Sequence, residues 1–430
     1  MTATAKKTRK VTEKQVKPRR KAHATEDIFI PQVNIGLVGH VDHGKTSLTA
    51  ALTGKWTDTH SEEVKRGITI RLGYHDVTFY KCAKCTGHAA YSTAATCLNC
   101  SGKAAPLRTV SFVDAPGHET LMTTVLSGAA LMDGALLVIA ANEPCPQPQT
   151  REHLSALDIV GIRNIIVVQN KIDLVTNEQA LENYQQIQKF LKGSVAENAP
   201  IIPVSAHQKT NLDAVVEAIE TVVPTPKRDS TKAPTMLIAR SFDTNRPGTP
   251  IEKLRGGVVG GSLLEGELKV GEKVEIRPGV MIKDSFTPVL TEISGLQKAQ
   301  KNLGNAGPGG LVGVQTLLDP FLTKSDSLSG NVLGLPGKLP PVLNELAFTV
   351  NLMERVVGTK QEIAVEPIKT GDNLMLVVGI TRTIGAVSTA SGKKAHTKLK
   401  IPICANKGER VAISRQVMGR WRLIGWGEIV

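Results

Sequence analysis

Short apolar runs alternate with helix-like segments between residues 33 and 223. The apolar runs occupy residues 33–38, 110–113, 135–141 and 165–168. Segments with helical spacing of apolar residues occupy 119–132, 150–159, 178–191 and 211–223. Continuous apolar runs of this length, separated by helices, are typical of buried parallel strands with crossover connections. The pattern predicts an α/β domain with a parallel-rich sheet.

A different pattern begins after the proline-rich segment 224–229. Residues 256–262 and 268–276 contain short alternating strands separated by glycine, which is typical of an all-β barrel. A second proline-rich break at 335–341 precedes another strand-rich stretch that continues to the last residue. We therefore predict an α/β domain over residues 28–224, followed by two all-β barrel domains over residues 230–340 and 341–430.

The end of the first predicted strand carries a phosphate-binding sequence. Gly39-His40-Val41-Asp42-His43-Gly44-Lys45-Thr46 has the spacing G-x-x-x-x-G-K-T and leads into a predicted helix. Its glycines let backbone N–H groups face a phosphate, Lys45 can reach the β- and γ-phosphates, and the Thr46 hydroxyl can bind Mg²⁺. A glycine-rich turn without a ligand is the alternative. The predicted nucleotide contacts in this loop are Asp42, His43, Gly44, Lys45, Thr46 and Ser47.

A second motif predicts which base is bound. Asn170-Lys171-Ile172-Asp173 follows an apolar strand, and the Asp173 carboxylate can accept both N1–H and N2–H of guanine. Adenine has no hydrogen on N1, so it would leave that carboxylate partly unpaired. Alone, the tetrapeptide is a common solvated turn, but here Ser205-Ala206-His207 follows it and can support guanine O6. The predicted ligand is GTP or GDP, contacted by Asn170, Lys171, Asp173, Ser205, Ala206 and His207.

Two segments between these motifs can sense the γ-phosphate. Asp114 ends an apolar run and can hold a Mg²⁺-bound water, while the Gly117 N–H can contact the γ-phosphate. The Thr69 hydroxyl can complete the Mg²⁺ shell in the triphosphate state. His118 is the candidate that places the attacking water, and a histidine near a helix start without a catalytic role is the alternative. We assign no arginine finger, so we expect slow hydrolysis that depends on a partner.

Four cysteines lie between Thr69 and Asp114, within a segment of about residues 81–103. They form two C-x₂-C pairs, with the spacing of tetrahedral Zn²⁺ sites. The predicted zinc ligands are Cys82, Cys85, Cys97 and Cys100. Because four thiolates leave no open position, we expect a structural site. Disulfides and an iron–sulfur cluster are the alternatives, and nothing in the sequence indicates an oxidising compartment.

The chain is basic, with 52 Lys and Arg residues against 39 acidic ones, a formal charge of +13. Residues 1–27 contain nine basic and three acidic side chains, so the excess also extends over the rest of the chain. Such a charge favours a phosphate-rich partner, RNA, and a solvated basic surface is the alternative. We expect residues 1–27 to be a disordered basic arm because they contain few apolar side chains.

The apolar runs are too short to cross a bilayer, and no apolar segment follows the N-terminal charges. We therefore expect no membrane association and a cytoplasmic location.

Taken together, the motifs resemble the translational GTPases of the elongation factor Tu type, in which a GTP-binding domain precedes two β-barrels. The chain resembles more closely the gamma-subunit family of archaeal translation initiation factor 2. This closer resemblance covers residues 33–430. It rests on the cysteine pairs and on residues 65–74, 142–153 and 414–427.

The resemblance implies a GTPase that binds initiator methionyl-tRNA, assembles with alpha and beta subunits and delivers the tRNA to the small ribosomal subunit. Hydrolysis of GTP after start-codon recognition would release the factor. Asp42 and the Gly67 carbonyl would help to hold a second Mg²⁺, so the implied Mg²⁺ residues are Thr46, Thr69, Asp114 (through water), Asp42 and Gly67.

Other functions share this combination of domains. An elongation-type aminoacyl-tRNA carrier would prefer a non-initiator tRNA, and a metabolic regulatory GTPase would activate a partner enzyme. A scaffold that binds GTP without hydrolysing it is a third possibility. The cysteine pairs and the basic charge argue against the metabolic function.

Overall fold

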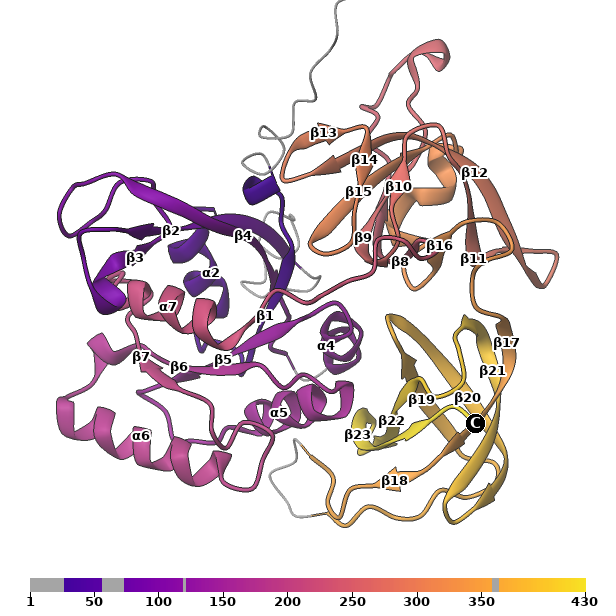
Figure 1. The fold of residues 1–430 in the computed structure, drawn as a ribbon. Coiled ribbons are helices and arrows are strands. Elements are labelled where there is room, and N and C mark those ends of the chain that lie inside the picture. Colours follow the sequence, from indigo (N-terminus) through magenta and orange to yellow (C-terminus); the bar gives the residue numbers. More distant parts are fainter. Residues whose placement is uncertain (1–26, 56–72, 119–120, 358–362) are drawn as a thin grey trace, which may run out of the picture.

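The computed structural model describes residues 27–55, 73–118, 121–357 and 363–430. The predicted basic arm, apart from its last residue, and the predicted Mg²⁺ residues Gly67 and Thr69 lie outside these ranges. Within the described ranges the chain forms an α/β domain, a second domain and a third domain (Figure 1).

The α/β domain is built on a seven-stranded sheet with the order β3-β2-β4-β1-β5-β6-β7. Strands β4, β1, β5, β6 and β7 run parallel, and β2 is antiparallel to β4. The strands are β1 Val33–Gly39, β2 Gly73–Cys82, β3 Tyr91–Ser92, β4 Ala104–Asp114, β5 Gly134–Ala140, β6 Ile165–Asn170 and β7 Ile201–Pro203. Every residue of β1, β5 and β6 is buried, which explains why these strands are mainly apolar.

Helices cover both faces of this sheet. They are α2 Lys45–Thr53, α4 Met122–Ala129, α5 Pro148–Val160, α6 Asn177–Leu191 and α7 Leu212–Val222. Apolar side chains of α2 and α7 pack on one face, and those of α4, α5 and α6 pack on the other. Local sequence sets some of the ends: Pro148 opens α5, and Thr176 caps α6 through reciprocal hydrogen bonds with Gln179.

The second and third domains are antiparallel β structures. The second contains β8 Thr235–Phe242, β9 Val258–Glu265, β10 Leu268–Lys269, β11 Lys273–Ile282, β12 Ser285–Lys298, β13 Lys301–Leu303, β14 Asn305–Ala306, β15 Leu311–Thr316 and β16 Val332–Gly334. Its main sheet closes because β11 pairs with both β16 and β12. The third contains β17 Val342–Thr349, β18 Asn351–Leu352, β19 Asn373–Val378, β20 Thr381–Ser391, β21 Lys394–Cys404, β22 Arg410–Val417 and β23 Arg420–Glu428. The predicted fold class is confirmed.

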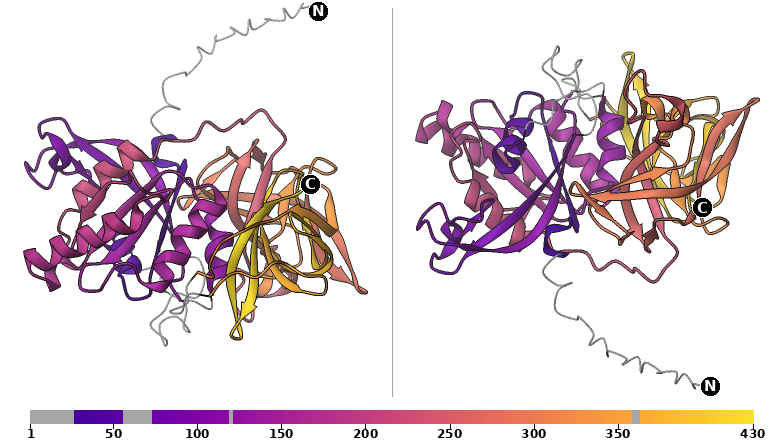
Figure 2. Two further views of the ribbon diagram at one scale, coloured as in Figure 1. Left: turned by 90° about the horizontal axis from the view of Figure 1, so that it is seen from below. Right: turned by 90° about the horizontal axis from the view of Figure 1, so that it is seen from above.

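The second and third domains lie together on one side of the α/β domain (Figure 2). The third domain packs against α4 and α5, and its Val377, Ala412 and Leu423 share an apolar core with those helices. The second domain meets the beginning of β1, where Asn34 Nδ2 donates to Ser262 Oγ at 3.1 Å. The phosphate-binding sequence thus begins at the opposite end of β1 from this contact.

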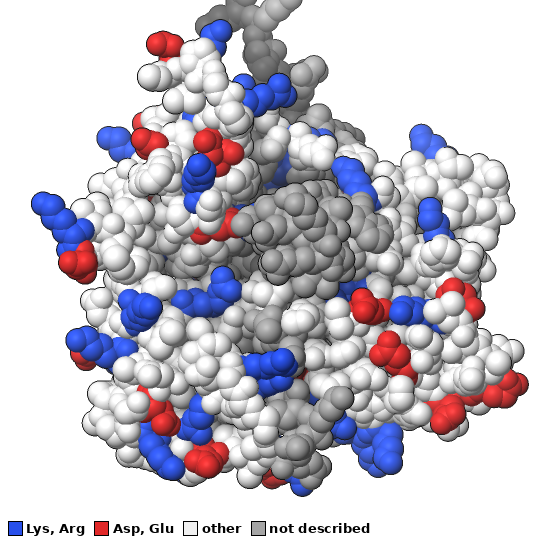
Figure 3. Space-filling view, turned by 180° about the vertical axis from the view of Figure 1, so that it is seen from behind, with Lys and Arg blue, Asp and Glu red and all other residues white. Residues whose placement is uncertain are grey.

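The charged side chains do not gather into one patch on the face shown in Figure 3, where Lys and Arg are interspersed with Asp and Glu. No helix among the described residues is long and apolar enough to cross a membrane.

A partly buried ion pair holds the linker between the first two domains. Arg228 Nη2 lies 2.6 Å from Asp133 Oδ1, and their side chains are 13% and 11% exposed. Asp133 Oδ2 also accepts from the Asn34 N–H at 2.8 Å, and Arg228 Nη1 donates to the Gln32 carbonyl at 2.9 Å. The carboxylate therefore connects the linker to the start of β1.

Replacing Asp133 with Asn should destabilise the chain by about 2 kcal/mol, because Arg228 would remain largely buried without its carboxylate. Asp158→Asn is the matched control: Asp158 pairs with Arg163, but these side chains are 56% and 60% exposed, so its loss should cost less than about 0.5 kcal/mol. Thermal unfolding of the full chain measures both. Equal shifts in the two variants would contradict the structural role of the Asp133 pair.

Candidate nucleotide-binding site

The phosphate-binding sequence forms a loop between β1 and α2. The loop requires glycine at Gly44, because φ is 88° there and a Cβ atom would lie 2.3 Å from Asn170 Nδ2. Lys45 begins α2, so the loop leads directly into the N-terminus of a helix, where backbone N–H groups favour an anion. Asp42 is exposed in this loop, whereas His43 is buried.

The Lys45 ammonium group lies inside the loop. Nζ donates to the carbonyls of Gly39 at 3.0 Å and His40 at 2.7 Å, and the residue is 6% exposed. Gly117 also comes close, since a Cβ atom there would lie 2.3 Å from Lys45 Nζ. The structure therefore brings the residue predicted to bind the β- and γ-phosphates next to the residue predicted to sense the γ-phosphate.

Two of the predicted Mg²⁺ residues are also neighbours. Thr46 Oγ1 donates to Asp114 Oδ2 at 2.8 Å, and Asp114, at the end of β4, is fully buried. A hydroxyl and a carboxylate are oxygen donors of the kind that Mg²⁺ prefers. These two side chains would hold the ion, which would neutralise phosphate charge, next to Lys45.

The Asn170 side chain joins the phosphate loop to the second half of the base-binding region. Its Nδ2 donates to the His43 carbonyl at 2.9 Å, and its Oδ1 accepts from the Ala206 N–H at 3.0 Å. Asn170 is 2% exposed, so these hydrogen bonds are made away from water. Its buried amide holds two separate loops together.

The other predicted base contacts lie just after Asn170 and on either side of Ala206. Asp173 lies exposed in the short turn Ile172–Leu174, which follows Lys171 in a left-handed backbone conformation. Ser205 is buried and its Oγ accepts from the Gln208 N–H at 3.0 Å, whereas His207 is exposed. The exposed Asp173 carboxylate is accessible to a ligand, and its role in base recognition stays a prediction.

Sequence reasoning missed His153 as a part of this site. Its Nδ1 accepts from the Gly39 N–H at 2.7 Å, and it is 1% exposed on α5. Burial lowers the pKa of His153 to about 3, so the ring is neutral and Nδ1 can accept a hydrogen bond at neutral pH. The only signal in the sequence was its position at the end of the 142–153 stretch.

His43 also has a structural contact that the motif did not indicate. Its Nδ1 lies 3.1 Å from the Val138 carbonyl, so the N–H on Nδ1 donates to β5. Burial lowers the pKa of His43 to about 3, which keeps this ring neutral as well. The His43 side chain thus anchors the loop to the sheet.

His118 follows Gly117 directly and is partly buried, and its carbonyl accepts from the Leu121 N–H at 2.9 Å. It therefore lies in the chain segment that contains Asp114 and Gly117. Its catalytic role stays a prediction.

The four predicted zinc ligands converge between β2 and β4. The Sγ atoms of Cys82 and Cys100 are 3.5 Å apart, those of Cys85 and Cys97 are 3.7 Å apart, and all four lie within 4.8 Å of one another. Zinc bound tetrahedrally to four thiolates at about 2.3 Å would space the sulfurs about 3.8 Å apart. The four residues are free cysteines, and their arrangement fits Zn²⁺.

Comparison with known proteins identifies the class. The profile of the elongation factor Tu GTP binding domain matches residues 31–225, and the profile of the initiation factor eIF2 gamma C-terminal domain matches residues 344–429. Together with the fold and the phosphate loop, these matches define a translational GTPase of the elongation factor Tu type, an enzyme that uses GTP and Mg²⁺.

Relatives that match over nearly their whole length show which family the chain belongs to. Translation initiation factor 2 subunit gamma of Pyrococcus furiosus is 60% identical over 402 residues, which cover 93% of this chain and 97% of that protein. The protein of the same name from Methanococcus vannielii is 59% identical over 403 residues, covering 93% and 98%. The chain therefore belongs to the family of translation initiation factor 2 gamma subunits, as the resemblance predicted.

Solved structures share the fold at lower identity. A bacterial selenocysteine-specific elongation factor, EF-Sec, has a TM-score of 0.71 and 23% identity, over 93% of this chain and 58% of that one. Elongation factor SelB from Methanococcus maripaludis, in complex with the GTP analogue GPPNHP, has a TM-score of 0.69 and 22% identity, over 93% and 79%. These likenesses confirm the arrangement of a GTP-binding domain with β-barrels.

Removing one thiol should abolish zinc binding, because a site with three ligands loses the closed tetrahedral geometry. We expect about one zinc ion per unaltered chain, little zinc in Cys97→Ser, and full zinc content in the control Cys145→Ser, which alters a cysteine outside the cluster. Metal analysis of the purified chains by mass spectrometry measures this. Full zinc content in Cys97→Ser would contradict the four-cysteine site.

Proposed function

We propose that this chain binds initiator methionyl-tRNA in its GTP-bound state and delivers it to the small ribosomal subunit, as the core of a heterotrimer with alpha and beta subunits. The proposal rests on membership of the gamma-subunit family and on the geometry of the phosphate site. It places the protein in the cytoplasm, where the small subunit begins translation.

One hydrogen bond supports the proposed link between nucleotide binding and tRNA binding. The Thr46 hydroxyl donates to Asp114, at the end of the strand that leads through Gly117 and His118 into α4. Helix α4 packs against the third domain, where Arg382 Nη1 donates to Thr124 Oγ1 at 3.0 Å. A change at the γ-phosphate would therefore reach the β domains through residues 114–118 and α4.

The proposed roles of the site residues follow from their positions. Lys45 and Gly117 contact the phosphates, and Thr46 and Asp114 hold Mg²⁺, with Thr69, Asp42 and the Gly67 carbonyl completing the proposed metal shells. Asp173 recognises guanine, supported by the loop that Asn170 joins. The remaining proposed nucleotide contacts are His43, Gly44, Ser47, Lys171, Ser205, Ala206 and His207. Cys82, Cys85, Cys97 and Cys100 bind a structural Zn²⁺ that braces β2 against β4.

An elongation-type tRNA carrier is the alternative function, and it shares the fold of the solved structures compared above. The two functions differ in the tRNA that is bound, because an elongation-type carrier would select a non-initiator tRNA. The choice of tRNA is therefore the direct test.

The chain, joined to its alpha subunit, should bind initiator methionyl-tRNA at least about tenfold more tightly with a nonhydrolysable GTP analogue than with GDP. Elongator methionyl-tRNA is the matched control, because it carries the same amino acid, and we expect weaker binding. Filter binding measures all four affinities. Equal affinities with the two nucleotides would contradict the proposal, and tighter binding of the elongator tRNA would favour the alternative.

His118→Ala should lower ribosome-stimulated GTP hydrolysis by about a hundredfold or more, because the attacking water would lose the group that positions it. The affinity for GTP should stay within about twofold, since the proposed role concerns only the hydrolysis step. His396→Ala is the control, because His396 is exposed on β21 of the third domain. Single-turnover kinetics measure the rates. Equal hydrolysis in the two variants would remove His118 from the mechanism.

A further inference from the structure

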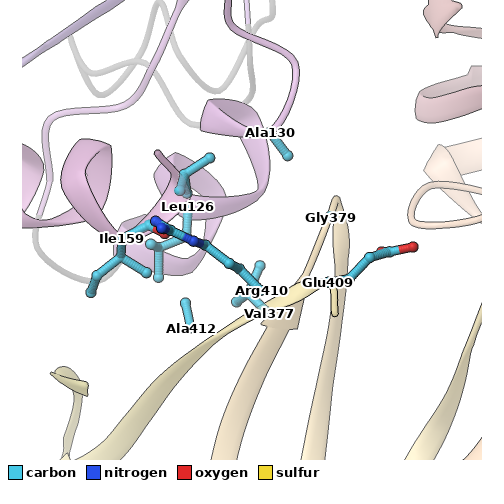
Figure 4. Close-up of a pocket in the computed structure, with 9 residues that line it drawn as sticks. Leu126, Ala130, Ile159, Val377, Gly379, Glu409, Arg410 and Ala412 are labelled. Atoms are coloured by element: carbon cyan, nitrogen blue, oxygen red, sulfur yellow. The ribbon is translucent and has the colours of Figure 1, made fainter. Parts of the chain in front are cut away.

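Two of the cavities formed by the described residues lie where domains meet. The first lies between α4, α5 and the third domain, and Arg410 extends from that domain to donate to the carbonyls of Asp158 at 3.1 Å and Ile159 at 2.7 Å (Figure 4). Arg410 is partly exposed and lies over the Trp426 ring, so carbonyls, water and an aromatic face all compensate its charge. This first cavity therefore offers no strongly buried cation to a ligand.

The second cavity, of about 530 Å³, lies between the segment before β1 and the second domain. Residues 30–32 line one part of it, and residues 303 and 305–308 line another. Next to it, the turn Asp27–Phe29 lies beside β13, where Lys301 Nζ is 5.3 Å from the centre of the Phe29 ring (Figure 1). Its volume is within the range of small-molecule sites, which often occur where domains meet.

The second cavity is lined by a buried cation, the Lys298 ammonium group at the end of β12. Lys298 is 3% exposed, and its Nζ donates to the carbonyls of Gly307 and Gly309, both at 2.6 Å. Among the described residues, no carboxylate forms an ion pair with it. A lysine ammonium has three N–H donors, so one remains. A buried charge without a counter-charge is costly, and an anion in the cavity would compensate it.

The other charges near Lys298 come from three further elements. Asp76 of β2 and Arg228 of the linker act on it through space, and Glu267 lines the same cavity. The Asp76 carboxylate already accepts a hydrogen bond from the Ser111 hydroxyl. Burial lowers the pKa of Lys298 to about 8, Arg228 adds to this effect and Asp76 opposes it. The side chain is therefore charged at neutral pH, with only partial compensation.

The surroundings of Lys298 indicate the class of ligand. One positive charge with one remaining N–H suits a monoanion. A phosphate dianion would bring a second negative charge close to the Gly307 and Gly309 carbonyls and to Glu267, which is unfavourable. Apolar side chains complete the lining of the cavity: Ile30, Pro31, Leu303, Ala306 and Pro308.

We propose that this cavity binds a small carboxylic acid in its ionised form, with the carboxylate at Lys298 and an apolar body against Ile30, Leu303 and Pro308. The bound molecule would contact the α/β domain and the second domain together, and it would stabilise their junction by mass action. The cavity lies before the start of β1, whereas the phosphate loop follows its end. The proposed site is therefore separate from the proposed nucleotide site.

The experiment uses para-fluorobenzoate as the probe and para-fluorobenzamide as a neutral control of nearly the same shape. Fluorine NMR of the full chain measures both affinities, with and without excess GDP and Mg²⁺. We expect a dissociation constant of about 1 mM for the benzoate and binding at least about tenfold weaker for the benzamide. GDP should change neither value, because the probe and the nucleotide bind at different places.

Three variants locate the probe. Lys298→Met keeps the length of the side chain but removes the charge, so the benzoate should lose about tenfold in affinity and bind like the benzamide. Lys301→Met is the matched control, because Lys301 lies opposite Lys298 in the β12–β13 hairpin but is exposed, and it should change neither affinity by more than about twofold. Leu303→Ala removes only apolar contact, so it should weaken both probes alike.

The pH dependence of the unaltered chain gives a second measure. Below pH 8 Lys298 is protonated, and the affinity for the benzoate should be constant. Above pH 8 the free ammonium loses its proton, so this affinity should fall, by about tenfold per pH unit once the pH is well above the pKa of Lys298. The affinity for the benzamide should not change, and Lys301→Met should show the same two profiles.

Equal affinities for the two probes, no binding of the benzoate, or its displacement by GDP would each overturn the carboxylate site. Unchanged benzoate binding in a folded Lys298→Met chain would also overturn it, and thermal unfolding shows whether that variant is folded. If it is not, the pH profile of the unaltered chain decides, since a profile that is flat through pH 8 excludes Lys298. Failure of the chain to bind GDP would concern the nucleotide site alone.

Discussion

The arrangement of the site depends on a buried cation, the ammonium group of Lys45. A buried charge is costly unless dipoles or opposite charges compensate it. Lys45 receives part of this compensation from two carbonyls of its own loop, which fixes the path of the backbone between β1 and α2. The close approach of Gly117 and the hydrogen bond from Gly39 to His153 are arranged around that path. The stability of the buried Lys45 ammonium group therefore depends on the correct packing of several chain segments.

The parts of the site that depend on residues close together in the chain could be predicted from the sequence. The phosphate loop and the cysteine pairs each depend on residues close together in the chain, so their spacing alone indicated what they form. The β domains were recognisable from short alternating strands. Helix ends were less accurate: the segment predicted as helical over 119–132 has its described helix at Met122–Ala129. The N–H groups of Leu131 and Met132 donate to carbonyls only three residues earlier, which ends the α-helix in a turn. The domain boundaries stay predictions.

Contacts between distant segments were not predictable in the same way. Glu152 and Arg422 are 270 positions apart, and nothing in either local sequence indicates that a carboxylate on a helix will be buried against another domain. The role of Asn170 was only partly predicted. Its motif suggested contact with the nucleotide, whereas the structure shows an amide that joins the His43 carbonyl to the Ala206 N–H. Such roles depend on how the domains and loops pack, which no short motif contains.

The third domain meets α4 and α5 through a shared apolar core and through charged side chains, which have a separate role. Arg422, Arg410 and Arg382 connect the third domain to α5 and α4, and Arg228 joins the linker to the α/β domain. Hydrogen-bonded charges fix orientation well but contribute little net stability, because their desolvation offsets most of the attraction. The charged contacts therefore fix the orientation of the domains, whereas the shared apolar core contributes most of the attraction between them.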